Sequence, residues 1–167
     1  MRAASEQRAL IAGLFQFYMY DFSEFEPADS DDFELNGEAR YEPYRYLDQY
    51  WVDEACTPLL IELGERVAGF ALINAFAHSG GVVDHSMAEF FVLRKYRRGG
   101  VGALAVREIL RRFPGCWEIA IAARNKPALA FWPRVVGGLD CIRELQTLQM
   151  DSPLWRGPIL RFESMGG

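Results

Sequence analysis

Residues 89–112, EFFVLRKYRRGGVGALAVREILRR, decide how the rest of the chain is understood. This stretch begins with an apolar run at residues 90–93 that has the length and composition of a β-strand. A basic turn with three glycines follows, and beyond it apolar residues recur at helical spacing. The stretch therefore predicts a strand that passes through a glycine-rich turn into a helix.

A turn of this kind is suited to holding an anion. The first N–H groups of a helix lack partners within the helix and carry partial positive charge. Glycines let the backbone approach a phosphate closely, and Arg97 and Arg98 add forked donors. The spacing fits neither a P-loop nor a dinucleotide fingerprint. An ordinary strand, turn and helix with solvated arginines is the alternative interpretation.

The spacing of Arg97, Gly100 and Gly102 matches Arg/Gln-x-x-Gly-x-Gly, and it resembles the pyrophosphate loop of the GNAT superfamily of N-acetyltransferases. A second segment, NKPALAFW at residues 125–132, is similar to the Asn-x-x-Ala-x-x-aromatic-Tyr segment of that family. The resemblance is specific over residues 89–137 and only topological elsewhere.

The resemblance and the order of elements predict one α/β domain over residues 1–167. Its mixed, mostly antiparallel central sheet is flanked by helices, and two strands splay at the acyl-CoA site. We expect a first helix over residues 4–20, with Leu10, Ile11, Leu14, Phe17 and Tyr18 on its apolar face. An acidic loop over 21–43 and a short strand within 44–52 follow. The next elements are a hairpin of strands 57–63 and 66–77 and a strand within 82–93, with a polar interruption or bulge at 84–86. After the helix at 101–112 come a strand at 117–122, a second helix capped by Asn125, and strands at 141–150 and 159–163.

Charge is distributed unevenly along the chain, whose net charge is −5. Residues 1–60 carry 13 acidic and 4 basic residues, and residues 61–167 carry 10 acidic and 14 basic ones. The later part suits an anionic ligand and the first part a cationic one, unless the charge serves only solubility. No apolar run reaches the roughly 20 residues of a membrane span, and no secretory signal is visible. The three separated cysteines form no disulfide framework or metal motif, so we expect a cytoplasmic protein without a metal or a membrane partner.

The resemblance implies acetyl-CoA as co-substrate. Its pyrophosphate is expected at the backbone of Arg97, Arg98, Gly99, Gly100, Val101 and Gly102. The backbone of Phe91 and Val92 is expected to pair with the pantetheine, where one N–H would face the developing oxyanion. Asn125 is expected either to hydrogen-bond the pantetheine or to serve only as a helix cap.

Glu89 is the predicted catalytic base, because it is a carboxylate within an otherwise apolar strand. It could instead face solvent or pair with an arginine, and His78 and His85 are the alternative bases. Trp132 stands where the second motif usually ends in tyrosine, and an indole cannot supply a proton. This departure leaves a catalytically weak or inactive CoA-binding module as the alternative function.

The acceptor is expected to be a primary amine: a small amine, an amino sugar, or a peptide or protein amine. Carboxylates and aromatic rings alternate in the segment DFSEFEPADSDDFEL at residues 21–35, and both attract ammonium groups. The segment could equally be a solvated loop. A nucleic-acid binder using the many arginines is disfavoured by the net charge of −5. The sequence leaves the acceptor and acyl chain open, and we expect a monomer or a homodimer.

Overall fold

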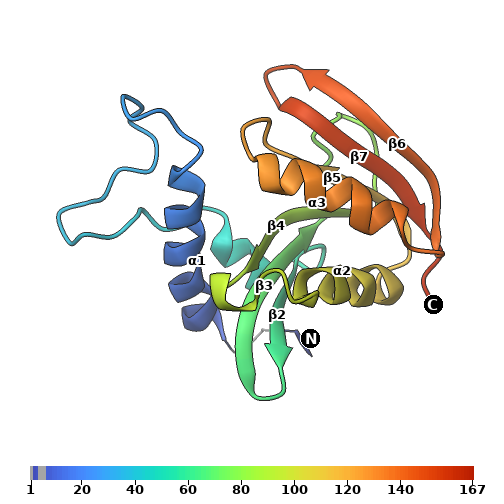
Figure 1. Ribbon diagram of the computed structural model, residues 1–167, viewed down its shortest axis with the longest axis horizontal. Helices are drawn as coiled ribbons and strands as arrows, with labels where there is room; N and C mark the ends of the chain where they lie inside the picture. The colour runs from blue at the N-terminus through green and yellow to red at the C-terminus, as the bar shows by residue number, and fades with distance from the viewer. Residues whose placement is uncertain (1, 4–6) are drawn as a thin grey trace.

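The computed structural model describes residues 2–3 and 7–167, which build a seven-stranded sheet in the order β1-β2-β3-β4-β5-β7-β6 (Figure 1). The strands are β1 (Arg2–Ala3), β2 (Thr57–Leu63), β3 (Arg66–Asn74), β4 (His85–Val92), β5 (Gly115–Ala120), β6 (Ile142–Asp151) and β7 (Arg156–Ser164). Among them β4 and β5 are parallel, and the other neighbours are antiparallel. The helices are α1 (Arg8–Ser23), α2 (Val101–Arg112) and α3 (Lys126–Gly137), with 3-10 helices η1 (Leu47–Trp51) and η2 (Arg94–Tyr96). The predicted fold class is confirmed.

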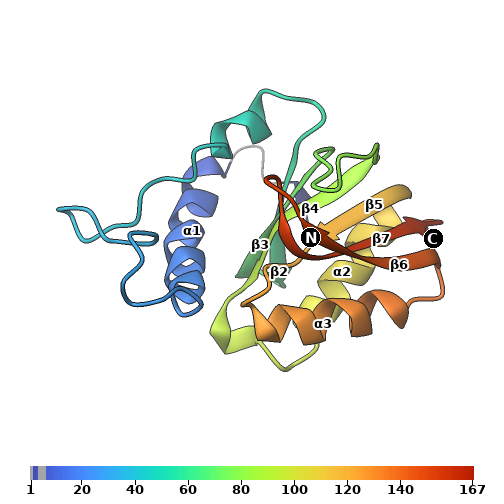
Figure 2. The same ribbon diagram turned by 90° about the horizontal axis from the view of Figure 1, so that it is seen from above.

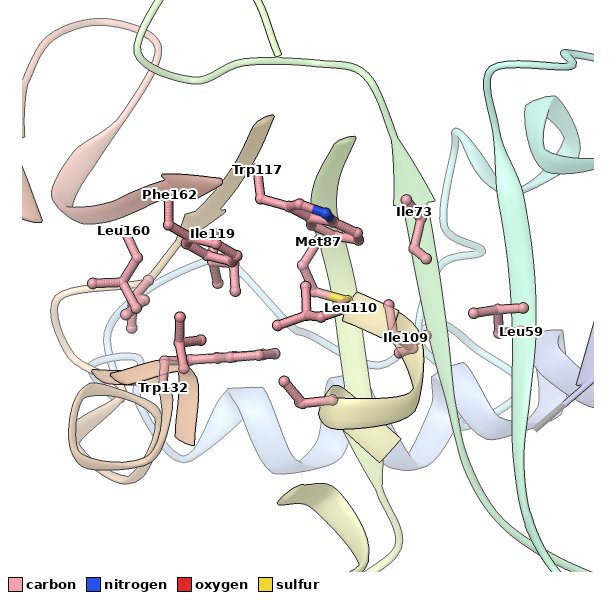
Figure 3. Close-up of a cluster of buried hydrophobic side chains, with 14 residues drawn as sticks. Leu59, Ile73, Met87, Ile109, Leu110, Trp117, Ile119, Trp132, Leu160 and Phe162 are labelled. Atoms are coloured by element: carbon pink, nitrogen blue, oxygen red, sulfur yellow. The ribbon is translucent and has the colours of Figure 1, made fainter. Parts of the chain in front are cut away.

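Helices cover both faces of the sheet. Figure 2 shows α1 on one side of strands β2 to β4, and α2 and α3 on the other. On the α1 side, Phe15 packs against Phe70 of β3 with ring centroids 4.6 Å apart. On the α2–α3 side, a larger cluster includes Met87, Leu110 and Trp132, and Figure 3 shows the Trp132 ring directed into it. Within the described part of the chain, no helix is long and apolar enough to cross a membrane.

The buried face of α1 differs from the expected one. Leu10 and Phe17 were expected on it, but they are 38% and 58% exposed. The helix instead packs Ile11, Leu14, Phe15 and Tyr18 against the sheet. These four follow the i, i+3, i+4, i+7 pattern of a single stripe, so Phe17 is rotated outward. Residues 4–6 of the predicted helix lie outside the described residues, and α1 extends to Ser23.

The strand predicted within residues 44–52 is wrong. This segment forms η1, whose buried residues Leu47 and Tyr50 are three positions apart, the repeat of a 3-10 helix. The interruption or bulge predicted at residues 84–86 is also wrong, since β4 starts at His85 and its ladder with β3 is regular from Ser86 to Met87. The pairing register of β4 with β3 shifts instead between Met87, which pairs with Ile73, and Glu89, which pairs with Leu72. This shift leaves Ala88 as a bulge.

Strands β4 and β5 separate soon after they meet. They pair only at His85 with Trp117 and at Ser86 with Glu118. Beyond these positions β4 pairs with β3 and β5 pairs with β7. Among the described residues, one edge of β4 from Met87 onward therefore has no strand beside it, and its backbone groups there are open to a ligand.

Candidate active site

Glu89 lies on β4 directly after the bulge, in register with Leu72 of β3. A bulge re-aims the side chains that follow it. The Tyr18 hydroxyl on α1 donates a hydrogen bond to Glu89 Oε2, and the Tyr44 hydroxyl also hydrogen-bonds this carboxylate. The half-buried Glu89 side chain therefore faces α1 and two phenols, and it pairs with no arginine among the described residues.

The surroundings of Glu89 tune its protonation near neutral pH. Burial raises the pKa of Glu89 to about 7, although the hydrogen bonds from Tyr18 and Tyr44 act in the opposite direction. Burial also raises the pKa of both tyrosines above the ordinary phenol value, with the Glu89 charge adding to the effect. The phenols therefore stay protonated as donors, and Glu89 is the member of this cluster that can take up a proton near pH 7.

The turn after β4 presents backbone donors at the start of α2. Gly100 is the residue before the helix and has a left-handed φ of 82°, which a residue with a Cβ adopts only with strain. The Leu104 N–H donates to the Gly100 carbonyl at 3.0 Å. The N–H groups of Val101, Gly102 and Ala103 precede that bond and have no partner within the helix. These free donors lie at the turn where the sequence predicts an anion site.

The arginine side chains of the turn are arranged differently from its backbone. Arg97 Nε donates to the Val92 carbonyl at 2.7 Å, and its Nη2 pairs with the Asp21 carboxylate of α1. Arg94 Nε donates to the same carboxylate at 2.7 Å. Arg98 and Gly99 are both exposed, and Arg98 has a φ of 63°. Asp21 therefore joins the turn to α1, a contact that the sequence motif did not indicate.

The open edge of β4 is formed by alternate residues. The Leu93 N–H donates to the Ala68 carbonyl of β3 at 2.8 Å. By the alternation of a strand, the Phe91 backbone also faces β3, whereas Phe90 and Val92 face the splay. A Cβ added to Gly69 of β3 would lie 1.9 Å from the Phe91 carbonyl oxygen, so the two strands approach closely at this glycine. Two residues, Phe91 and Val92, were expected at the pantetheine, and only Val92 presents its backbone to the open edge. Phe90 presents its backbone there as well, which sequence reasoning missed.

The second motif lies at α3. Asn125 Oδ1 accepts the Ala128 N–H at 3.0 Å, as a helix cap does. Trp132 is 6% exposed, and its ring centroid lies 5.1 Å from that of Phe90. Trp132 therefore takes the tyrosine position as a core side chain.

The two histidines pack against residues outside the Glu89 cluster. His85 Nε2 is 3.2 Å from the Pro114 carbonyl, and the His85 ring packs against Trp117. The His78 ring lies 4.9 Å from that of Trp155, and burial lowers the pKa of His78. Within the described part of the chain, neither histidine packs on a residue that contacts Glu89, although Trp155, the partner of His78, also lines a nearby cleft.

A cleft of about 580 Å³ opens between the end of α1, the residues after β5 and the β6–β7 hairpin. Its aromatic walls are Phe22, Phe25 and Trp155. The Phe22 ring lies 4.7 Å from the ring of Tyr18, the residue that bonds Glu89. The cleft therefore adjoins the Glu89 cluster, and its volume suits a small molecule.

The charged residues in the cleft wall are Glu26, Arg124 and Arg156. Arg124 Nη1 pairs with Glu26 Oε2 at 2.6 Å and so bridges the end of α1 to the start of α3. The aspartates of the predicted amine-binding loop, Asp29, Asp31 and Asp32, are exposed and lie outside the lining. Figure 1 shows the loop that carries them projecting away from the sheet beyond α1.

Comparison with known proteins gives the same class of fold. The model of the Acetyltransferase (GNAT) family matches residues 17–137, well over half of the chain. This chain therefore belongs to the GNAT family of acetyltransferases, which are acyl-CoA-dependent enzymes. No curated protein matches the sequence.

Solved structures support the fold at low sequence identity. An acetyltransferase from Thermus thermophilus has a TM-score of 0.62 at 13% identity, covering 95% of this chain and 90% of that one. A GNAT-family acetyltransferase from Streptococcus pneumoniae has a TM-score of 0.55 at 18% identity, covering 99% and 98%. Spermidine N-acetyltransferase from Vibrio cholerae, in complex with CoA and spermine, has a TM-score of 0.55 at 13% identity, covering 97% and 92%.

Proposed function

We propose that this protein transfers an acetyl group from acetyl-CoA to a primary amine, with Glu89 as the general base. The observation that carries the proposal is the Glu89 carboxylate on the splayed strand, with a pKa of about 7. A base of this pKa is ionised for part of the population at neutral pH and still basic enough to accept a proton.

The chain holds the acyl donor mainly through its backbone. In this proposal the N–H groups of Val101, Gly102 and Ala103 bind the pyrophosphate, together with the backbone of residues 97–100. The backbone of Phe90 and Val92 pairs with the pantetheine along the open edge. For Val92, this requires the Arg97 side chain to leave the carbonyl that it now occupies. The bound acetyl-CoA supplies an activated acyl carbon.

The acceptor amine occupies the cleft beside Phe22. Glu89 removes the proton from the attacking nitrogen, either directly or through one water molecule. The protonated Tyr18 and Tyr44 hold the carboxylate in place. A backbone N–H of the open edge is the donor for the developing negative charge on the carbonyl oxygen. We further propose that residues 1–167 act as one domain, in the cytoplasm, as a monomer or homodimer.

The second candidate function is a GNAT-fold module that binds CoA but turns over slowly or not at all. The buried Trp132 favours it, because no tyrosine hydroxyl stands there to protonate the leaving thiolate. An activity assay separates the two functions, since only the transferase consumes acetyl-CoA in the presence of an amine.

Calorimetric titration with acetyl-CoA tests the donor site. Gly100→Glu places a carboxylate beside the expected pyrophosphate and should abolish saturable binding. Gly64→Glu is the matched control, because Gly64 is also a left-handed glycine with nothing within 4 Å, but it lies in the β2–β3 turn. Wild-type protein that fails to bind acetyl-CoA would overturn the proposed function.

Turnover is then measured as thiol release with a panel of primary amines. Amine-dependent release of CoA supports the transferase. Binding without release for every amine would leave the CoA-binding module as the function.

A further inference from the structure

The charges in the cleft wall are unsuited to a polyamine. Glu26 is the one carboxylate among the lining residues, and it is already paired with Arg124. The second arginine of the wall, Arg156, pairs with Asp151 outside the lining. The lining residues therefore carry one acidic and two basic side chains, and none offers an unpaired carboxylate to a second ammonium group.

Arg124 brings unused hydrogen-bond donors to the cleft wall. A guanidinium has five N–H donors, and among the described residues Arg124 uses only Nη1, on Glu26. The Trp155 indole Nε1 has no acceptor among the described residues, but it is buried and not open to the cleft. The unused donors of Arg124 are complementary to an anion, and the guanidinium fork matches a carboxylate in particular.

Arg124 is also held in a defined place. It follows β5 and directly precedes Asn125, the cap of α3, so its backbone is fixed by the start of that helix. The ion pair with Glu26 directs its side chain across the cleft toward the end of α1. On that side Phe22 contacts Tyr18, which contacts Glu89. Arg124 therefore lies in the cleft wall, and Glu89 is reached from that wall through Phe22 and Tyr18.

We propose that the acceptor is an amino acid with an aromatic or apolar side chain, its carboxylate bound by Arg124 and its amine directed to Glu89. This inference rests on the proposed transferase function and assigns the substrate class of its acceptor site. Phe22, Phe25 and Trp155 supply the apolar surface for the side chain. Glu26 orients the guanidinium and disfavours acceptors that are wholly anionic.

The reaction balances without a further reactant. The amine nitrogen forms a bond to the acetyl carbon, and the C–S bond of the thioester breaks. The acceptor ammonium first loses one proton to solvent, so that a neutral amine attacks. Glu89 then accepts the second proton that leaves nitrogen, and CoA leaves as the thiol after protonation from solvent. The product, an N-acetyl amino acid, keeps the carboxylate that Arg124 binds and loses its ammonium charge.

The test compares L-phenylalanine with L-phenylalaninamide, which differ only in the carboxylate. We expect kcat/KM to favour the amino acid in wild type and Arg124→Gln to reduce that preference about tenfold, the value of a charge-assisted hydrogen bond. Because the ratio of the two substrates is compared between enzymes, their different amine basicities cancel. Arg134→Gln is the control, since Arg134 is an exposed arginine on α3 outside the cleft lining, and it should keep the wild-type ratio.

The possible outcomes separate this inference from the proposed function. Turnover of amines with an unchanged ratio in Arg124→Gln, or a preference for spermine over L-phenylalanine, overturns the inference and leaves the transferase standing. If no acceptor is turned over, calorimetric titration of L-phenylalanine into the CoA-loaded protein decides the carboxylate site. If L-phenylalanine binds to wild type but not to Arg124→Gln, the carboxylate site is supported even though the transferase fails. If wild type does not bind L-phenylalanine, both the carboxylate site and the transferase function are overturned.

Discussion

The turn between β4 and α2 and the loop after α1 both concentrate charge, yet only the turn fixes it in space. In the turn, Gly100 adopts a left-handed conformation, the first N–H groups of α2 are aligned, and Arg97 makes two side-chain bonds. In the loop, Asp29, Asp31 and Asp32 are exposed, and Figure 1 shows the segment projecting from the fold. The difference indicates that charge forms a site where helix geometry or burial constrains it, and stays solvated elsewhere.

The largest expected effect concerns stability. Trp132→Ala should lower the free energy of unfolding by about 3–5 kcal/mol, because it removes a core side chain and leaves a cavity among α2, α3 and the sheet. Leu35→Ala in the projecting loop is the comparison, and it should change the free energy by no more than about 0.5 kcal/mol, since Leu35 is 53% exposed. Urea denaturation measures both. Similar losses in the two variants would mean that the loop packs as tightly as the core.

The next effect concerns catalysis. Glu89→Gln should lower kcat by about 100-fold, the contribution of a general base. In wild type, kcat/KM should fall about tenfold per pH unit below about 7, since protonation removes the base there.

Neutralising Asp29, Asp31 and Asp32 together should change KM for the acceptor less than about twofold, because exposed charges are screened. A large rise in KM in that triple variant would show that the loop binds the amine after all.

Stability measurements separate catalysis from unfolding in Glu89→Gln. Burial raises the pKa of Glu89 in the folded state, so its stabilising contribution is complete below the ordinary glutamate pKa and is lost as pH rises through about 7. A glutamine avoids that loss. The variant should therefore melt no lower than wild type at about pH 8, and a clearly lower melting temperature would attribute the lost activity to unfolding.

A smaller effect is expected from the phenol that bonds the base. Tyr18→Phe removes a hydrogen bond that lowers the pKa of Glu89, so the acid limb of the pH profile should move up by about one unit. Tyr20→Phe, two residues along α1 and 61% exposed, should leave the profile unchanged. A uniform loss of kcat with no shift of the limb would mean that Tyr18 has only a packing role.

The same contrast explains how much the sequence could predict. The turn and the cap at Asn125 were predictable, because glycine spacing and capping act over a few neighbouring residues. The contact of Tyr18 with Glu89 spans 71 positions, and that of Arg124 with Glu26 spans 98. Such pairs depend on how α1 packs on the sheet, and apolar spacing alone placed the exposed Phe17 on the buried face. Glu89 stood out only because a carboxylate is unusual in an apolar strand.

The smallest effect concerns Asp21, where the turn meets α1. Asp21→Asn frees Arg94 and Arg97, so their guanidinium groups become available to an anion, and the Val92 carbonyl becomes easier to expose. We expect acetyl-CoA to bind about threefold tighter by calorimetry, the effect of breaking a partly exposed ion pair. Asp29→Asn changes the net charge equally without touching the turn, and it should leave the affinity unchanged. Weaker binding in Asp21→Asn would mean instead that Asp21 holds the arginines in the geometry that acetyl-CoA requires, so that the fixed charge of the turn depends on α1 as well as on its glycines.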